Sequence, residues 1–264
     1  MSRIKDTFTR LRSEKQTGLV TFVTAGDPDM DRSGVVLDSI DQAGADVLEI
    51  GVPFSDPLAD GPVIQRSAER ALRSGATLAS TLDLIERLRP RLSAEVVVFS
   101  YVNPLLAMGF DTFAMRAADA GVDGVLVLDL PIEEAEDLRE SVCNFGIDPI
   151  FLLSPTTTRD RIQRAADLGG GFLYGISRLG VTGERETVAA GAKELVERIR
   201  QVTSMPLALG FGISRPEHVV EVGRWADAAV VGSGLVKTIA GASDGLDLAG
   251  EVYKYVRWLK GESG

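Results

Sequence analysis

The chain has 264 residues and a formal net charge of −10, with one cysteine and one histidine. One cysteine excludes a disulfide framework, and one histidine excludes a multi-histidine metal site, so we expect no bound metal. The acidic balance argues against general binding to nucleic acid or to an anionic membrane surface. No apolar run reaches the ~20 residues of a membrane span, and charges throughout residues 1–15 argue against a secretory signal. We therefore expect a cytoplasmic protein.

Eight short apolar runs rich in β-branched residues recur along the chain, and each is typical of a buried strand. They span residues 18–25, 45–51, 95–103, 124–131, 148–154, 171–177, 206–213 and 228–236. Segments with helical periodicity lie between them, at residues 33–43, 78–92, 132–145, 159–168 and 190–202. This alternation predicts parallel strands joined by right-handed crossovers, and eight βα units favour a closed (β/α)8 TIM barrel.

The ends of the chain extend this prediction. Before the first strand, Ile4, Phe8 and Leu11 are spaced as on one face of a helix, which we expect to cap the N-terminal mouth of the barrel. No linker or charge block separates parts of the chain, so we predict one domain over residues 1–264. An open doubly wound sheet is the alternative, but TAGDP at residues 24–28 replaces its usual glycine-rich phosphate turn.

A glutamate inside the second apolar run is the first candidate for catalysis. Period-two alternation places Glu49 on the same face of its strand as Val47. A buried, unpaired carboxylate is costly, and desolvation raises its pKa, which suits a proton donor or acceptor. The alternative is a structural glutamate that is satisfied by an arginine or lies at the barrel rim.

The loop after this run supplies two further carboxylates, Asp56 and Asp60, in a segment with three prolines at residues 53–62. Active sites of such barrels lie at the C-terminal ends of the strands, so either aspartate could act there. Both could instead form turns or cap the helix that begins near Pro62. The sequence alone does not choose between them.

Glycine-rich segments follow the seventh and eighth runs, where barrels often bind phosphate through backbone N–H groups. These segments are GFGIS at residues 210–214 and GSG at residues 232–234. Backbone donors can hold a dianion despite the acidic balance of the chain, whereas the alternative is that the glycines only turn the chain. The segment 177–185 has two glycines and is typical of a mobile lid, although a plain surface loop has the same composition.

Several residue types are missing where other reactions need them. The lysines lie outside the apolar runs, which disfavours a Schiff-base aldolase. His218 stands alone and is expected on a helix surface, and Cys143 is expected to be a buried structural thiol. General acid–base catalysis by carboxylates on a small phosphorylated substrate remains.

One long segment, LEIGVPFSDPLADGP at residues 48–62, combines the candidate carboxylates. It is followed in order by YVNP at 101–104, DLP at 129–131, SPT at 154–156, SRLGVTG at 177–183 and GFGI at 210–213. Together these motifs closely resemble the tryptophan synthase alpha subunit family over nearly the whole chain. The resemblance implies a lyase of tryptophan biosynthesis that reversibly cleaves indole-3-glycerol phosphate to indole and glyceraldehyde 3-phosphate.

The resemblance also implies roles for individual residues. Glu49 would protonate indole C3 and assist proton movement at the glycerol hydroxyl. Asp60 would bind the indole N–H and stabilise the cationic indolenine, and Tyr174 would orient Glu49 or the glycerol hydroxyls. The apolar walls of the indole site would be Phe22, Phe99, Leu126 and Ile150. The phosphate would be held by Gly183, Gly212, Gly232 and Ser233, and Thr182 on the lid would reach Asp60.

A partner is implied as well, a β subunit that carries pyridoxal phosphate and receives indole through a tunnel in an αββα heterotetramer. No cofactor is then expected in this chain itself. The Asp56 loop and residues 178–186 would lie at the subunit contact. Two other functions stay open: a catalytically weak barrel that mainly activates a β-type partner, and another phosphate-binding barrel such as a sugar-phosphate isomerase.

Overall fold

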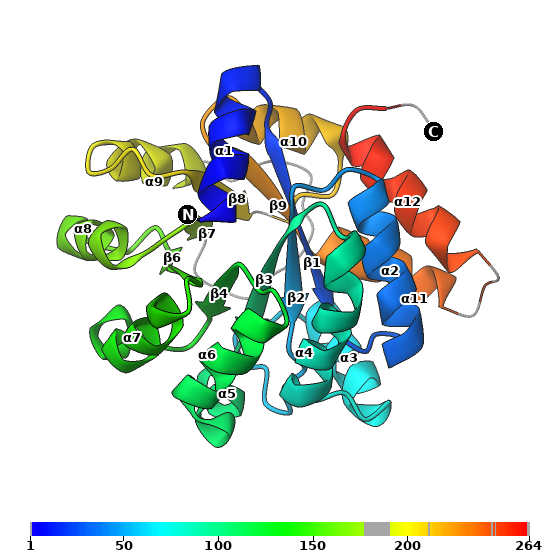
Figure 1. Ribbon diagram of the computed structural model, residues 1–264. Coiled ribbons are helices and arrows are strands. Elements are labelled where there is room, and N and C mark those ends of the chain that lie inside the picture. Colours follow the sequence, from blue (N-terminus) through cyan, green and yellow to red (C-terminus); the bar gives the residue numbers. More distant parts are fainter. Residues whose placement is uncertain (1, 177–190, 211, 244, 246, 263–264) are drawn as a thin grey trace.

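The structure, a computed structural model, describes residues 2–176, 191–210, 212–243, 245 and 247–262. Its strands form one parallel sheet that curves into a barrel, with helices packed around the outside (Figure 1). The strand order is β5-β4-β3-β2-β1-β9-β8-β7-β6, so the first and last strands of the chain are paired. The strands are β1 Gly18–Thr24, β2 Val47–Gly51, β3 Glu95–Ser100, β4 Gly124–Val127, β5 Asp148–Ile150, β6 Leu152–Leu153, β7 Leu173–Ile176, β8 Leu207–Gly210 and β9 Ala228–Val231.

The predicted (β/α)8 barrel is confirmed, with one predicted run divided in two. Both β5 and β6 come from the run at 148–154, and Phe151 lies between them. β5 pairs with β4, whereas β6 pairs with β7, so the sheet changes partner at this residue. The chain itself bridges the point where the two ends of the sheet meet.

The helices are α1 Arg3–Glu14, α2 Met30–Gln42, α3 Pro62–Arg73, α4 Leu78–Leu88, α5 Val102–Met108, α6 Phe110–Asp119, α7 Glu136–Asn144, α8 Arg159–Leu168, α9 Gly191–Arg200, α10 Pro216–Val222, α11 Ser233–Ala242 and α12 Leu248–Leu259. Short 3-10 turns lie at η1 Arg89–Arg91 and η2 Ile132–Glu134. Within the described part of the chain, none of these helices has the length and apolar character needed to cross a bilayer.

Several of the predicted strands end earlier than their apolar runs, and two of these runs continue directly into a helix. The run at 95–103 leaves the sheet after Ser100, and the run at 228–236 leaves it after Val231. Each run continues into a helix whose first turns are also apolar, so the hydrophobic pattern does not mark the strand end. The C-terminal ends of β3 and β9 consequently lie where the sequence suggested mid-strand, and α5 and α11 begin at the barrel mouth.

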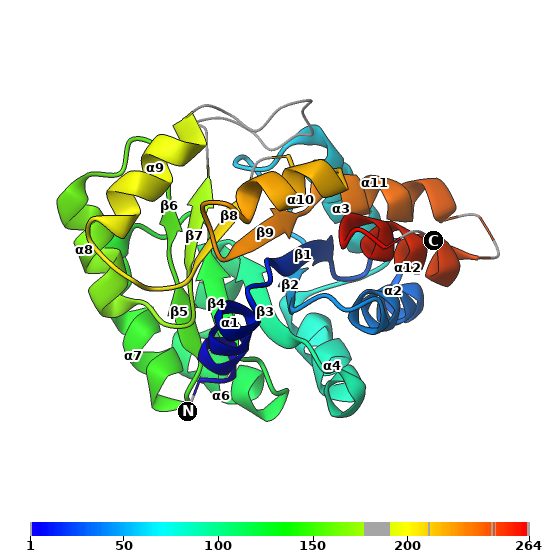
Figure 2. The same cartoon turned by 90° about the horizontal axis from the view of Figure 1, so that it is seen from above.

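The inside of the barrel is filled from the N-terminal side by α1, which lies against that mouth in Figure 2. Ile4, Phe8 and Leu11 are all buried and pack with inward-facing strand residues such as Val47 and Val97. The predicted capping helix is therefore confirmed. Leu48 and Ile50 belong to the second apolar layer, between the sheet and the outer helices.

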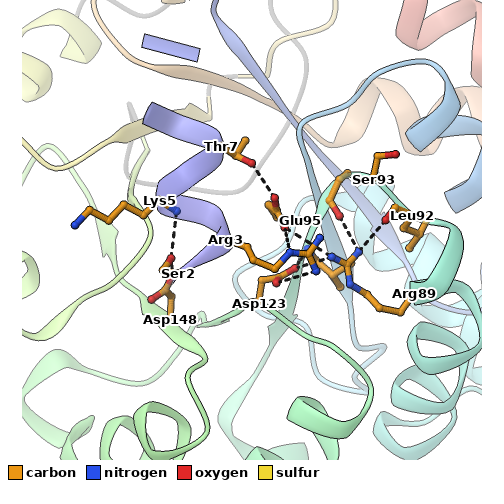
Figure 3. Close-up of polar contacts among 12 residues, drawn as sticks. Ser2, Arg3, Lys5, Thr7, Arg89, Leu92, Ser93, Glu95, Asp123 and Asp148 are labelled. Atoms are coloured by element: carbon orange, nitrogen blue, oxygen red, sulfur yellow. Dashed lines mark hydrogen bonds and ion pairs between the residues drawn. The ribbon is translucent and has the colours of Figure 1, made fainter. Parts of the chain in front are cut away.

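Polar contacts hold α1 in this position (Figure 3). Arg3 Nε lies 3.2 Å from Glu95 Oε2, and Thr7 Oγ1 donates a 2.8 Å hydrogen bond to Glu95 Oε1. Arg89 lies 3.4 Å from Asp123, whose Oδ2 also accepts a 2.8 Å bond from the backbone of β3. These contacts join α1, η1 and the starts of β3 and β4 at the end of the barrel away from the candidate site.

Candidate active site

Glu49 points into the barrel from β2, in register with Phe22 on β1 and with Val97 on β3. Its side chain is fully buried, and neither carboxylate oxygen has a hydrogen-bond partner among the described residues. Removal from water raises the pKa of Glu49 to about 8. The alternative of a structural glutamate paired with arginine therefore finds no support, and the group can carry a proton near neutral pH.

Asp60 lies in the loop between β2 and α3 and is also buried. Its Oδ2 accepts a 3.0 Å hydrogen bond from the Tyr101 hydroxyl, and its backbone oxygen accepts a 2.9 Å bond from Gln65 Nε2. Burial raises the pKa of Asp60 to about 6, and the bond from Tyr101 opposes that rise. The carboxyl is consequently ionised above about pH 6 in a site that excludes most water.

The structure shows which of the two candidate aspartates faces the pocket, a choice that the local sequence pattern left open. Asp56 is exposed, and its carboxylate accepts a 2.6 Å bond from the neighbouring Ser55 hydroxyl. Asp60 lines a small pocket at the C-terminal ends of β1, β2 and β3, and Asp56 does not. Asp60 is therefore the carboxylate placed to meet a ligand.

Aromatic and aliphatic side chains enclose this pocket. The rings of Phe22 and Phe99 meet edge to face with centroids 5.1 Å apart. A side chain at Gly51 would lie 2.6 Å from the Phe22 ring, so glycine there leaves room for that ring. The full lining comprises Phe22, Thr24, Gly51, Val52, Phe54, Pro57, Asp60, Ile64, Ala68, Phe99 and Tyr101.

The four predicted apolar walls fall into two groups. Phe22 and Phe99 line the pocket. Leu126 and Ile150 lie in register with Phe99 across β4 and β5, but both are buried in the barrel interior with the side chains of α1. A flat aromatic ligand in the pocket would therefore meet phenylalanine rings first, with the two aliphatic residues deeper in the barrel.

Tyr174 lies on β7, in register with Ala208 on β8. Burial raises the pKa of its hydroxyl well above the ordinary value, and the negative charges of Glu49 and Asp60 raise it further. A side chain at Gly210 would lie 3.0 Å from the Tyr174 oxygen, so this glycine makes space for the phenol. The Tyr174 hydroxyl therefore stays protonated, and it lies close enough to both predicted acid–base groups for their charges to act on it.

The predicted phosphate-binding segments lie at neighbouring strand ends, because β8 and β9 are paired. Gly212 has φ +69°, a conformation that glycine adopts without strain. Gly232 precedes the first turn of α11, which begins at the buried Ser233, and it adjoins Phe22 of the pocket. The first N–H groups of a helix have no acceptor within the helix, and here no side chain caps them, which suits an anion. Thr182 and Gly183 lie outside the described residues.

Tyr101 belongs to the YVNP motif at residues 101–104, but the sequence patterns predicted no role for it. It is buried at the junction of β3 and α5, where its hydroxyl contacts Asp60 and accepts a 3.1 Å bond from the backbone of Ala59. Its ring lies 5.0 Å from that of Phe54. The available signal was a hydroxyl near the C-terminal end of an apolar run, at the same edge of the barrel as Asp60.

Two expectations about isolated reactive side chains are wrong. Cys143 is exposed near the end of α7, because the neighbouring Val142 takes the inward position. His218 is buried, because its Nδ1 turns back to accept a bond from the backbone N–H of Ser214. The described residues contain no cluster of three or more His, Cys, Asp or Glu side chains that could hold a metal ion.

Known proteins match this chain over nearly its whole length. The profile of the family "Tryptophan synthase alpha chain" matches residues 8–258. The tryptophan synthase alpha chain of Citrifermentans bemidjiense is 50% identical over 237 residues, which are 90% of this chain and 89% of that protein. That of Solibacter usitatus is 43% identical over 98% of this chain and 97% of its own length.

Solved structures with a similar fold point to the same family as the sequence matches. A structure of Mycobacterium tuberculosis tryptophan synthase superimposes with a TM-score of 0.92 at 32% identity, covering 98% of this chain and 97% of that one. Tryptophan synthase subunit alpha from Legionella pneumophila gives a TM-score of 0.91, also at 32% identity, covering 99% and 98% of the two chains. The chain therefore belongs to the tryptophan synthase alpha chain family, whose members are lyases that cleave indole-3-glycerol phosphate to indole and glyceraldehyde 3-phosphate.

Proposed function

We propose that Glu49 and Asp60 carry out the acid–base and electrostatic steps of this cleavage, with Tyr174 orienting Glu49 or the glycerol hydroxyls. The observation that carries the proposal is a fully buried glutamate that has no hydrogen-bond partner among the described residues, on the strand that leads directly into the Asp60 loop. A group held in this state releases or takes up a proton near neutral pH. Asp60 supplies a negative charge in the adjoining pocket.

In the first step, protonated Glu49 gives its proton to indole C3, and the ring becomes a cationic indolenine. The positive charge develops at the ring nitrogen, whose N–H faces the ionised Asp60. A fixed carboxylate in a site with little water stabilises this cation more strongly than solvent does. Tyr101, bonded to Asp60, keeps that carboxylate in place.

In the second step, the Glu49 carboxylate takes the proton from the glycerol hydroxyl on the carbon attached to the ring. The bond from that carbon to indole C3 breaks, its electron pair returns to the ring, and an aldehyde forms. Indole keeps the first proton, and Glu49 recovers one from the substrate, so the enzyme ends as it began. One residue thus serves as acid and then as base.

The remaining predicted residues hold the substrate. Phe22 and Phe99, with Leu126 and Ile150 deeper in the barrel, would contact the indole ring, and the loops of Gly212, Gly232, Ser233 and Gly183 would bind the phosphate. Thr182 would reach Asp60 when the lid closes. Every proton transfer is assigned to side chains of this chain, so we propose that it uses no cofactor of its own.

We further propose a β-subunit partner that carries the pyridoxal phosphate, in an αββα heterotetramer. The chain's likeness to a structure of Mycobacterium tuberculosis tryptophan synthase supports this assignment. In the loop that holds Asp56, Leu58 is 86% exposed, which suits a residue that a partner covers. One domain over residues 1–264 and a cytoplasmic location belong to the same proposal, the latter because the single cysteine needs no oxidising compartment.

Indole release from indole-3-glycerol phosphate tests the proposal, measured with the purified chain alone, with an added β subunit, and with the Glu49→Gln variant. We expect slow cleavage alone, faster cleavage with the partner and none in the variant. Substantial turnover by the variant would remove Glu49 from its role. Activation of the partner without any cleavage would favour the activating-barrel function, and turnover of sugar phosphates would favour an isomerase.

A further inference from the structure

Residues 212–215 lie between β8 and α10 and include Gly212, one of the proposed phosphate-binding glycines. The buried His218 follows them in the first turn of α10. Within the 212–215 loop, Ser214 is held through both of its backbone polar groups. Its N–H donates to His218 Nδ1 at 3.4 Å, and its carbonyl oxygen accepts a bond from the Tyr255 hydroxyl at 3.2 Å. The two partners come from different helices, α10 and α12.

The loop has a third anchor between Ser214 and Gly212. Ile213 is 2% exposed and belongs to the apolar layer outside the sheet. Gly212 comes immediately before it, with φ +69° and its backbone at the barrel mouth. With Ile213 buried and Ser214 bonded on both sides, the orientation of the Gly212 peptide is determined from the C-terminal side of the loop.

The bond from Ser214 requires an unprotonated Nδ1 on His218, because a protonated ring nitrogen cannot accept. The imidazole is 6% exposed, so water has little access to replace it as an acceptor. Loss of the acceptor would leave the Ser214 N–H without a partner in a partly buried loop. His218 thus has a defined task that its type alone did not reveal.

We propose that His218 and Tyr255 are positioning residues that hold the β8–α10 loop in the shape that binds the phosphate group of the substrate. The inference rests on the proposed function, in which the Gly212 loop holds that phosphate. Neither residue touches the reacting atoms. They affect binding of the substrate and of the transition state equally, because the phosphate has the same charge in both, so KM changes and kcat does not.

The test compares His218→Ala and His218→Asn with wild type, in the full chain with the β subunit present. We expect His218→Ala to raise KM for indole-3-glycerol phosphate and the inhibition constant of inorganic phosphate by about tenfold each, with kcat within about twofold. Asparagine places an oxygen at the same number of bonds from Cα as Nδ1, so His218→Asn restores both constants. Val220→Ala is the matched control, since this residue is exposed on the same helix.

Tyr255→Phe gives a second, independent variant that keeps the ring pairing with Trp258 and removes the hydroxyl. We expect a smaller rise in the same two constants. Unchanged KM and phosphate inhibition in both His218→Ala and Tyr255→Phe would overturn the inference, as would a fall in kcat at constant KM. If His218→Ala does not fold, unchanged constants in Tyr255→Phe alone overturn it. Wild type that phosphate does not inhibit competitively would instead overturn the underlying phosphate site.

Discussion

Asp227 at the N-terminal end of the barrel and Glu49 toward the C-terminal end are two carboxylates with different surroundings. At the N-terminal end, Asp227 lies 2.7 Å from Arg12 and 2.5 Å from Arg200, and it accepts a 2.8 Å bond from the backbone of Leu207. Burial acts to raise the pKa of Asp227, but these bonds and charges outweigh it, and the pKa is lowered. At the C-terminal end, Glu49 has no such partner within the part of the chain that the structure describes, and its pKa is raised to about 8.

The presence or absence of charged partners indicates which carboxylate stabilises the fold and which is available for proton transfer. A paired carboxylate keeps its charge and contributes to stability. An unpaired one lowers stability when it is ionised, and its proton can then be transferred near neutral pH. Changing each carboxylate to its amide should therefore have opposite consequences for activity and for the free energy of unfolding, and these can be measured directly.

The largest effect is expected on activity. Glu49→Gln removes the proton donor and acceptor while keeping the shape of the side chain, so kcat should fall about 10³-fold or more. Phosphate inhibition should stay unchanged, because the phosphate loops lie on other strands. The measurement is steady-state indole release, with competitive phosphate inhibition as the second readout.

Asp227→Asn is the matched control, since it makes the same chemical change at the other end of the barrel. Its kcat/KM, measured with a saturating concentration of the β subunit, should remain within about twofold of the wild-type value. If both variants lost activity to the same extent, the division of roles between the two ends would be wrong.

The same pair of variants should change the free energy of unfolding in opposite directions at pH 9. Between pH 4.5 and about 8, folded Glu49 keeps a proton that the unfolded chain releases, so its contribution to stability falls as the pH rises. Glu49→Gln should therefore stabilise the chain by at least about 2 kcal/mol at pH 9, and by little at pH 5. Asp227→Asn should destabilise it by about 2 kcal/mol, because two arginines lose their partner.

Urea unfolding of both variants and wild type at pH 5 and pH 9 measures these differences. The lowered pKa of Asp227 means that its stabilisation is present above the unfolded pKa and disappears as the pH falls through the folded pKa. A Glu49→Gln variant that is less stable than wild type at pH 9 would show that the ionised carboxylate has a partner.

The sequence was informative wherever one position contradicted its surroundings. Glu49 could be found because a charged residue interrupts an apolar strand pattern, and α1 because three apolar residues share one helical face. The local pattern alone did not choose between Asp56 and Asp60, and only the family resemblance pointed to Asp60, because the deciding contact comes from Tyr101, 41 residues further on. His218 was misplaced for the same reason, since its bond to Ser214 depends on the path of a loop. Local patterns predict elements and faces, whereas pairings between loops need the fold.

The pH dependence of kcat/KM tests the ionisation states assigned to Asp60 and Glu49. Asp60 acts when ionised, so activity should fall as the pH drops below about 6, the pKa that burial gives it. Glu49 must be protonated in the first step, so activity should also fall as the pH rises above about 8. A bell-shaped profile between these limits is expected, and a rate that continues to rise through pH 9 would contradict the role of Glu49 as the acid.

The acid limb of the profile can come from Asp60 or from the substrate, because a phosphate ester has its own second pKa of ~6. A small change in the Asp60 pKa tells the two contributions apart. The Tyr101 bond holds the pKa of Asp60 down against burial. Tyr101→Phe should therefore move the Asp60 component of the acid limb upward by about 0.7 pH units, the equivalent of one ~1 kcal/mol hydrogen bond.

The substrate's own titration does not change in this variant, and the phenylalanine ring can still pack on Phe54, whose centroid lies 5.0 Å from that of Tyr101. Activity at pH 8 should fall no more than about fivefold, because Asp60 remains ionised there. Profiles of kcat/KM for the two proteins, recorded at the same ionic strength, make the measurement. An acid limb that stays in place would assign it to the substrate phosphate, and a downward shift would mean that the Tyr101 hydroxyl does not stabilise the ionised form of Asp60.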